Sequence, residues 1–151
     1  MYGSFDAGLL YEVLALSPPW YVREVGFDDE TGNTVTVTLE FTVGSEFTCS
    51  TCGADGCKAY DTFPKRWRHV DFFQYRCYLR AYSPRVVCPK CGIRQAKIPW
   101  ARLRSRVTYE FEEYLVNLME ELPSYRALAR IVGEHDTRVR RLVKALTERG
   151  P

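Results

Sequence analysis

This chain is organised around two short stretches, Cys49-Ser-Thr-Cys52-Gly53 and Cys88-Pro-Lys-Cys91-Gly92. Two thiolates separated by two residues can bind one tetrahedral metal ion from a tight turn, and two such knuckles complete a four-sulfur site. The intervening residues 53–87 have room for one or two β-hairpins. We therefore predict one structural Zn²⁺ with no open coordination position for a substrate. Its predicted ligands are Cys49, Cys52, Cys88 and Cys91.

Three further side chains are candidates for the metal or for the core. Cys57 lies close behind the first knuckle and is an alternative ligand. His69 is a second alternative, although we expect it to form a hydrogen bond within a hairpin. Cys77 lies in a strand pattern and is expected to be a small core residue. A thiol redox enzyme usually needs one Cys-x-x-Cys motif at a helix start, so two knuckles argue against that activity.

The composition bounds the class of protein. The chain has 151 residues, 46% hydrophobic and 26% charged, which is enough for one medium domain or two or three small ones. No apolar run approaches the ~20 residues of a membrane span. The first twenty residues lack a basic segment, and Asp6 and Glu12 interrupt their apolar stretch, so they do not resemble a signal peptide. Six cysteines without a secretion signal favour a reducing compartment and metal binding.

The charges are strongly segregated along the chain. Residues 1–48 carry one arginine and eight acidic residues, a net charge of −7. Residues 49–108 carry thirteen Lys and Arg and three Asp, a net charge of +10, whereas residues 109–151 are close to neutral at −1. The basic zinc segment is expected to face phosphates, with the acidic residues turned away from them. The alternative is a solvated basic face without a ligand.

The chain begins with a helix pattern over residues 5–16. Ser4 or Asp6 can cap its start, and Ser17-Pro18-Pro19 ends it, because proline cannot continue a helix. Its apolar stripe consists of Leu9, Leu10, Val13, Leu14 and Leu16.

Alternating apolar residues predict strands in the next part of the chain. Residues 21–27 and 34–43 are expected to form a hairpin around a turn at 28–33. Residues 70–82 and 93–98 are expected to be strands on either side of the second knuckle. The apolar face of the second strand consists of Val35, Val37, Leu39, Phe41 and Val43.

From Thr108 onward the pattern is helical. Thr108 caps the first of three helices, Ser124 caps the second and Gly133 ends it, and Asp136 or Thr137 starts the third. Their inward residues are expected to be Phe111, Tyr114, Leu115, Leu118, Met119 and Leu122, then Leu128, Ile131 and Val132, then Val139, Leu142, Val143 and Leu146.

Residues 125–144 fit a DNA-reading helix-turn-helix. Ala129 is small where two helices must cross closely, and Gly133 permits the positive φ of the turn. Glu134 departs from the pattern, since an apolar residue is common at that position. The third helix is the predicted recognition helix, and the alternative is a helix with a solvated basic face. The predicted DNA contacts are His135, Thr137, Arg138, Arg140, Arg141 and Lys144, together with Arg102, Arg104 and Arg106 of the linker.

Aromatic residues are concentrated in the zinc segment and its linker. Stacking on nucleic-acid bases is one role for them, and filling the core of a small zinc module is the expected one. The residues concerned are Trp67, Trp100, Phe72, Phe73, Tyr75, Tyr78 and Tyr82.

The knuckles belong to a longer pattern that resembles a known family. The pattern continues in Trp67-Arg68-His69-Val70-Asp71, Pro84-Arg85-Val86-Val87, Pro99-Trp100-Ala101-Arg102 and Ala129-Arg130-Ile131-Val132-Gly133-Glu134-His135-Asp136-Thr137-Arg138. In this order the segments resemble the N-terminal region of insertion-sequence transposases of the ISL-three family. The resemblance covers nearly the whole chain.

The resemblance implies a zinc-binding domain and a helix-turn-helix that recognises the inverted terminal repeats of a transposon in double-stranded DNA. In that family a nuclease-fold domain with three acidic residues on Mg²⁺ normally follows, and it is expected to begin near Gly150-Pro151. The chain as given is therefore expected to bind DNA without catalytic residues of its own. The implied location is the bacterial cytoplasm, in association with the nucleoid and not with a membrane. A homodimer is left open.

We thus predict an α+β protein with a zinc-ribbon-like β module and a C-terminal three-helix unit containing the helix-turn-helix. The expected divisions are an N-terminal helix and hairpin at 1–46, the zinc module at 47–100, a basic linker at 101–107 and the helical unit at 108–151. The predicted function is recognition of transposon ends by part of a transposase, without enzyme activity. The alternative is a free-standing zinc-dependent transcriptional regulator, which would bind a promoter instead.

Overall fold

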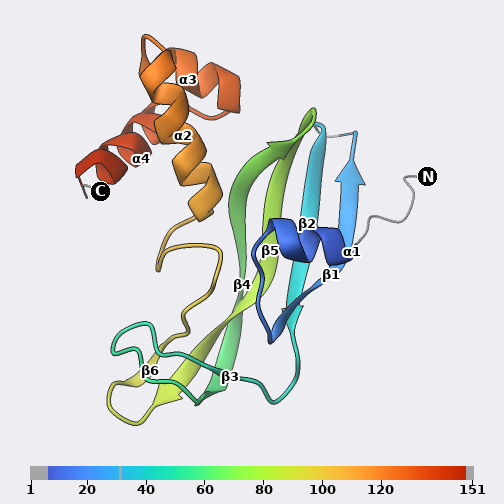
Figure 1. Ribbon diagram of the computed structural model, residues 1–151, viewed down its shortest axis with the longest axis vertical. Coiled ribbons are helices and arrows are strands. Elements are labelled where there is room, and N and C mark those ends of the chain that lie inside the picture. The colour runs from blue at the N-terminus through green and yellow to red at the C-terminus, as the bar shows by residue number, and fades with distance from the viewer. Residues whose placement is uncertain (1–6, 31, 149–151) are drawn as a thin grey trace.

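The structure, a computed structural model, describes residues 7–30 and 32–148, so Ser4 and Asp6, the two predicted caps of the first helix, lie outside the described residues. A twisted sheet occupies one side of the molecule, and three C-terminal helices lie beside its upper end (Figure 1). The helices are α1 (Ala7–Val13), α2 (Tyr109–Glu121), α3 (Tyr125–Val132) and α4 (Asp136–Glu148). The strands are β1 (Trp20–Asp28), β2 (Thr34–Phe41), β3 (Glu46–Phe47), β4 (Cys57–Phe72), β5 (Tyr75–Cys88) and β6 (Gly92–Gln95). The predicted mixed α+β class is confirmed.

The long antiparallel hairpin of β4 and β5 forms the centre of the sheet. Trp67 pairs with Leu79 in its middle, and the chain reverses between Phe72 and Tyr75. The prediction of one strand over residues 70–82 is therefore wrong. Phe73 takes a positive φ of 56° at the reversal, and its ring is 84% exposed. The aromatic residues on both sides of the turn all favour strand, so secondary-structure propensity alone does not predict the turn.

The N-terminal hairpin joins this central hairpin through a parallel contact. β1 and β2 pair antiparallel as predicted, and β2 then pairs parallel with β5, with Val37 beside Leu79. The sheet order is β1-β2-β5-β4-β3, and β6 pairs with the far end of β5. One sheet thus contains strands from both of the predicted segments, residues 1–46 and residues 47–100.

The sheet carries its own hydrophobic core, in which three tryptophans meet. Trp100 packs edge-to-face on Trp20 and on Trp67, with ring centroids 4.7 and 5.3 Å apart. Trp67 and Trp100 are each 1% exposed, so the expected core role is confirmed for both. Val43 is wrongly assigned to the apolar face of β2, because the strand ends at Phe41 and Val43 is 96% exposed.

The helices agree with most of the predicted boundaries. Thr108 and Ser124 cap α2 and α3 by accepting hydrogen bonds from Phe111 N and Ala127 N. Gly133 ends α3 in the left-handed conformation, with φ 72°. The three helices share a second core that includes Phe111, Leu115, Leu128, Ala129, Val132, Val139 and Val143.

Three predicted inward positions are wrong. Leu9 and Val13 of the first helix are exposed: Leu10 is the one buried residue among those of α1 whose burial is described, and Leu14 and Leu16 follow the helix into the core. Ile131 of α3 is half exposed. Among the described residues, no helix has the length and apolar character needed to cross a membrane.

Candidate metal centre and nucleic-acid interface

Four cysteine thiols converge at the end of the sheet where β3 and β6 lie (Figure 1). Cys49 is held by an isolated bridge to Ala96, and Cys88 is the last residue of β5. The sulfur atoms of Cys49, Cys52, Cys88 and Cys91 all lie within 4.8 Å of one another, and those of Cys52 and Cys88 are 3.5 Å apart. Sulfur atoms around a tetrahedral zinc with 2.3 Å bonds lie about 3.8 Å apart. The four thiols therefore fit one such ion.

The backbone at the knuckles favours thiolates. N–H groups of Lys90 and Cys91 point at the Cys88 sulfur and lower the pKa of its thiol to about 6. The N–H of Cys52 is the chief cause of the lowered pKa of Cys49. Hydrogen bonding with Cys52 is the chief cause that raises the pKa of Cys91 to about 12. Four neighbouring thiols cannot all ionise without a cation among them, so this donor set suits a divalent metal.

The other two cysteines and His69 lie outside this cluster. Cys57 is buried, and its sulfur is 3.5 Å from the carbonyl oxygen of Ala54. Cys77 is buried in the core of the sheet as predicted, and burial raises the pKa of its thiol to about 12. His69 forms its hydrogen bond with Thr108, the cap of α2, across 2.8 Å from Nδ1 to Oγ1. The partner thus lies on the helical unit, and not within the hairpin as predicted.

The linker is fastened to the sheet before the helices begin. Arg68 N donates to Arg106 O, Thr108 N donates to Arg68 O, and Tyr109 N donates to Trp100 O, at 2.8, 3.0 and 2.9 Å. Arg102 pairs with the buried carboxylate of Glu112 at 2.9 Å and lies over the ring of Tyr109. Its guanidinium therefore supports the start of α2, and its predicted DNA contact stays a prediction.

Two basic grooves flank the linker. One, of about 440 Å³, runs between the linker and α4 and includes Arg104, Arg106, Arg138 and Arg141 in its lining. The structure thus brings together predicted DNA contacts that are more than thirty residues apart in the sequence. The other, which we call the knuckle groove, has a volume of about 710 Å³ and lies between the first knuckle and the linker. Four of its lining residues are cationic: Lys65, Lys97, Arg102 and Arg104.

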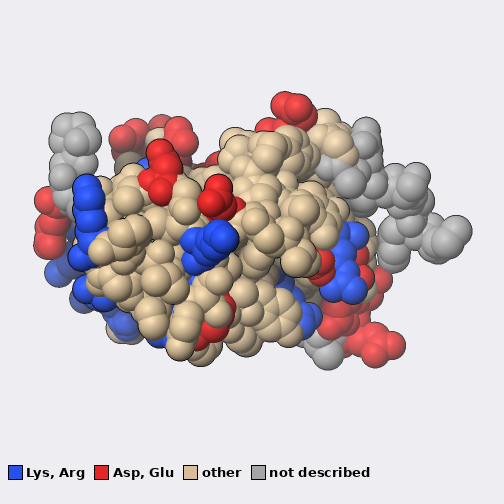
Figure 2. All heavy atoms as spheres, turned by 90° about the horizontal axis from the view of Figure 1, so that it is seen from below, with Lys and Arg blue, Asp and Glu red and all other residues tan. Residues whose placement is uncertain are grey.

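The remaining predicted contacts lie along the exposed side of α4. His135 is exposed, and its carbonyl accepts the first helical hydrogen bond, from Val139 N at 3.0 Å. Thr137 and Arg140 line a third hollow beside α3, where Arg140 lies over the ring of Tyr125 at 5.4 Å. Arg141 and Lys144 are exposed. Seen from below, Lys and Arg gather on the left, the side on which the helices lie (Figure 2).

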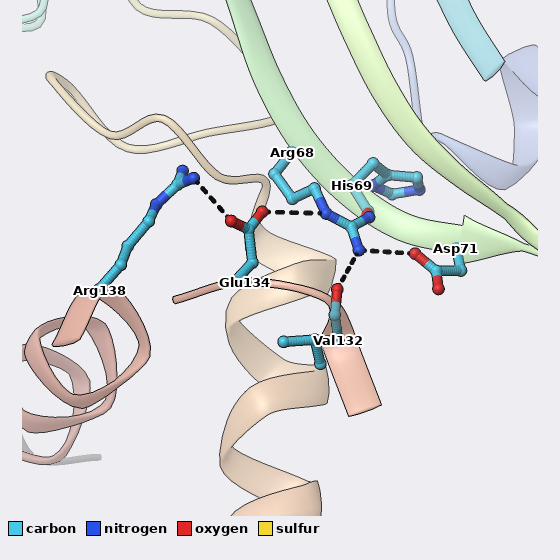
Figure 3. Close-up of polar contacts among 6 residues, drawn as sticks. All are labelled: Arg68, His69, Asp71, Val132, Glu134 and Arg138. Atoms are coloured by element: carbon cyan, nitrogen blue, oxygen red, sulfur yellow. Dashed lines mark hydrogen bonds and ion pairs between the residues drawn. The ribbon is translucent and has the colours of Figure 1, made fainter. Parts of the chain in front are cut away.

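Sequence reasoning missed the residue that connects the helices to the sheet. Arg68 of β4 is 1% exposed, and Figure 3 shows its guanidinium between Asp71, Val132 and Glu134. Glu134 also pairs with Arg138 at 3.1 Å, which explains why a carboxylate stands where an apolar residue is common. Glu134 was the sequence signal for this contact. An acid at a position that is commonly apolar is expected to be largely buried, and a buried acid needs a cation as partner.

Comparison with known proteins places both halves of this arrangement in one class. A family model described as the zinc-finger of transposase IS204/IS1001/IS1096/IS1165 matches residues 45–91, which contain all four clustered cysteines. A second, described as the helix-turn-helix domain of transposase family ISL3, matches residues 96–147. Both models describe parts of insertion-sequence transposases.

Individual transposases are also similar to this chain. The transposase for insertion sequence element IS1557 of Mycobacterium tuberculosis is 38% identical over 66 residues, which are 41% of this chain and 15% of the relative. The transposase for IS1001 of Bordetella parapertussis is 27% identical over 110 residues, or 72% of this chain and 27% of the relative. The matches thus span roughly a quarter or less of these relatives. No solved structure matches the chain.

Residues 45–91 and 96–147 thus correspond to the zinc-finger and helix-turn-helix regions of transposases of the ISL3 (ISL-three) family.

Proposed function

We propose that this chain is the DNA-binding region of a transposase and recognises the inverted terminal repeats at transposon ends. The observation that supports this best is the order of the two family matches, a zinc finger on the cysteine cluster followed by a helix-turn-helix on the three helices. In this proposal the chain binds double-stranded DNA without catalytic residues of its own. Cleavage of DNA would belong to another part of a transposase.

The proposed metal is a single Zn²⁺ bound by Cys49, Cys52, Cys88 and Cys91. Four thiolates would fill the coordination sphere, so the ion would stabilise the fold and not bind a substrate. It would connect the loop after β3 to the end of β5, and thereby fix the walls of the knuckle groove. Zinc-binding free energy in such a module is largely folding free energy.

The proposed helix-turn-helix consists of α3, the turn at Gly133 and α4, with α2 as the supporting third helix. In this arrangement α4 enters the major groove, where Arg can pair bidentately with guanine. Thr137, Arg141 and Lys144 fall on one side of α4 because residues three and four apart share a helix face. His135, Arg138 and Arg140 complete the contacts near its start, and Arg102, Arg104 and Arg106 bind backbone phosphates beside it.

The division of the chain follows the proposed functions. Residues 1–46 and 47–100 supply the sheet and the metal site, residues 101–107 the basic linker, and residues 108–151 the reader of DNA bases. Two copies of the chain forming a homodimer would match two inverted repeats. The proposed location is the bacterial cytoplasm, at the nucleoid.

The experiment that tests this proposal selects binding sites from a random-sequence duplex pool with the zinc-loaded chain, and compares them with the ends of the encoding element. Arg140→Ala and Arg141→Ala are each expected to lower affinity for the selected site by about 1–3 kcal/mol, because each removes a base-edge or phosphate contact. Arg23→Ala, in which the lost side chain pairs with Glu40 on the far side of the sheet, is the control and should bind normally. Selection of a promoter sequence would favour the regulator, and unchanged binding of both variants would move the interface away from α4.

A further inference from the structure

Arg68 is a buried cation whose contacts all lie at the junction between the sheet and the helices. Its Nη2 donates to the carbonyl oxygen of Val132 at 2.7 Å and pairs with Asp71 at 2.7 Å. Its Nε pairs with Glu134 at 3.3 Å, and its Nη1 donates to the carbonyl of His69 (Figure 3). A buried arginine is retained only where partners offset its desolvation, and here it has two carboxylates and two carbonyls.

These partners belong to separate elements that converge on the turn between α3 and α4. Val132 is the last residue of α3, where the helix leaves carbonyls unpaired and the helix dipole favours a cation. Glu134 lies in the turn and also pairs with Arg138 of α4. Ion pairs therefore run from α4 through Glu134 and Arg68 to Asp71 at the end of the β4–β5 hairpin.

The same residue also fixes the linker through its backbone. Arg68 N and O bond to Arg106 O and Thr108 N, which attaches the start of the helical unit to β4. These backbone bonds alone would leave the helical unit free to pivot about the line along which they lie. The side chain of Arg68 supplies a second attachment, at the α3–α4 turn, where it reaches Val132 and Glu134 (Figure 3), and a body held at two places cannot pivot freely.

We propose that Arg68 is a positioning residue for DNA recognition. It fixes the start of α4 relative to the sheet that carries the cysteine cluster, so that both parts bind one duplex at a single spacing. This inference rests on the proposed function, because it assumes that α4 and the knuckle groove contact the same DNA. If Arg68 fixes these two parts, the fold of the protein sets the distance between the two DNA segments that it contacts.

The coupling itself can be tested without DNA. Residual dipolar couplings of the zinc-loaded chain in a neutral stretched gel are expected to fit one alignment tensor for sheet and helices together. Arg68→Met, and to a lesser degree Glu134→Gln, should require separate tensors, because the second attachment is lost.

Arg66→Met is the matched control: this exposed arginine of the same strand lies over Tyr78 and should leave one shared tensor. A shared tensor in Arg68→Met with normal zinc content would overturn the inference, and so would separate tensors in the wild type. If Arg68→Met does not fold, Glu134→Gln decides by the same criterion.

The consequence for recognition is tested on a duplex selected from a random pool by the wild-type chain. Hydroxyl-radical footprinting should show two protected segments, and inserting about 5 base pairs, roughly half a helical turn, between them should weaken wild-type binding about tenfold or more. Arg68→Met should bind the parent duplex about tenfold more weakly and lose most of the insertion penalty, to within about twofold. Arg66→Met should keep the full penalty. An undiminished penalty in Arg68→Met, or a single protected segment, would overturn the inference. Failure of the wild-type chain to select any duplex would instead refute the proposed function, and the dipolar couplings would still decide the coupling.

Discussion

The six cysteines of the chain occupy two different kinds of environment. Four form the cluster at the end of the sheet, whereas the other two are buried outside it: Cys57 beside the cluster, where burial and its neighbour Cys88 raise the pKa of its thiol, and Cys77 in the core of the sheet. The Cys-x-x-Cys spacing was sufficient to predict which four sulfur atoms come together. It could not predict the local partner of Cys57, because that depends on how the loop after the knuckle folds back to the Ala54 carbonyl.

The cluster leads to a first prediction. Cys88→Ser should bind less than one zinc per chain and lose cooperative thermal unfolding, because structural zinc supplies folding free energy of order ~10 kcal/mol. Cys77→Ala, at a buried cysteine outside the cluster, is the control and should keep one zinc at a cost of about 1 kcal/mol. Zinc content by atomic absorption and melting by circular dichroism make the comparison. A full zinc complement in Cys88→Ser would be incompatible with the proposed ligand set.

His69 makes stability depend on pH. Burial, with the nearby charge of Arg68 as a lesser cause, lowers the pKa of the His69 imidazole to about 4. The unfolded chain therefore binds a proton at His69 below pH about 6.5 while the folded chain does not, so stability falls as pH drops from about 6.5 to about 4. The loss expected from this group is about 3 kcal/mol.

His69→Gln keeps a hydrogen-bonding side chain beside Thr108 and removes the titration, so its free energy of unfolding should fall less over that range than that of the wild type. Urea unfolding at several pH values measures the difference. The only other histidine, the exposed His135, provides the control His135→Gln, which should follow the wild type. Parallel curves for His69→Gln and the wild type would show that His69 is not buried in its neutral form.

At the scale of the elements, local signals predicted the helices better than the strands. Hydroxyl side chains at Thr108 and Ser124 and the glycine at 133 act within their own helix ends, so the sequence alone revealed them. The reversal at Phe73 carries neither glycine nor proline, and the strong strand formers around it concealed the turn. The pairing register of β4 with β5 sets the position of the turn at Phe73, and local composition does not predict this register.

The turn between α3 and α4 gives a prediction at this scale. Gly133→Ala should destabilise the chain by about 1–2 kcal/mol, because alanine must adopt a φ of 72° and its methyl group would displace the Arg76 guanidinium, 2.5 Å away. Gly26→Ala in β1, where an added methyl group has no neighbour within 4 Å, is the control and should change stability little. Chemical denaturation with an unchanged m-value would identify the effect as one of stability. Equal stability of the two variants would mean that the turn tolerates an ordinary residue.

In the whole molecule, two contacts between segments distant in the sequence determine how the parts are joined, and the sequence did not predict either contact. The parallel pairing of β2 with β5 joins the N-terminal hairpin to the zinc segment, although the two strands are separated by the entire first knuckle and β4. The Arg68 contacts join residues more than sixty positions apart. Charge segregation predicted a basic middle segment, but folding alone assembles the linker and α4 arginines into one groove.

We propose that this assembled surface recognises a particular DNA sequence. The most direct measurement is fluorescence anisotropy of the zinc-loaded chain with a duplex from the terminal repeat of the encoding element, against a scrambled duplex of equal composition at the same salt concentration. We expect the chain to bind the terminal repeat about 10³-fold or more tightly than the scrambled duplex, as is usual for specific recognition. Equal affinities for the two duplexes would contradict it.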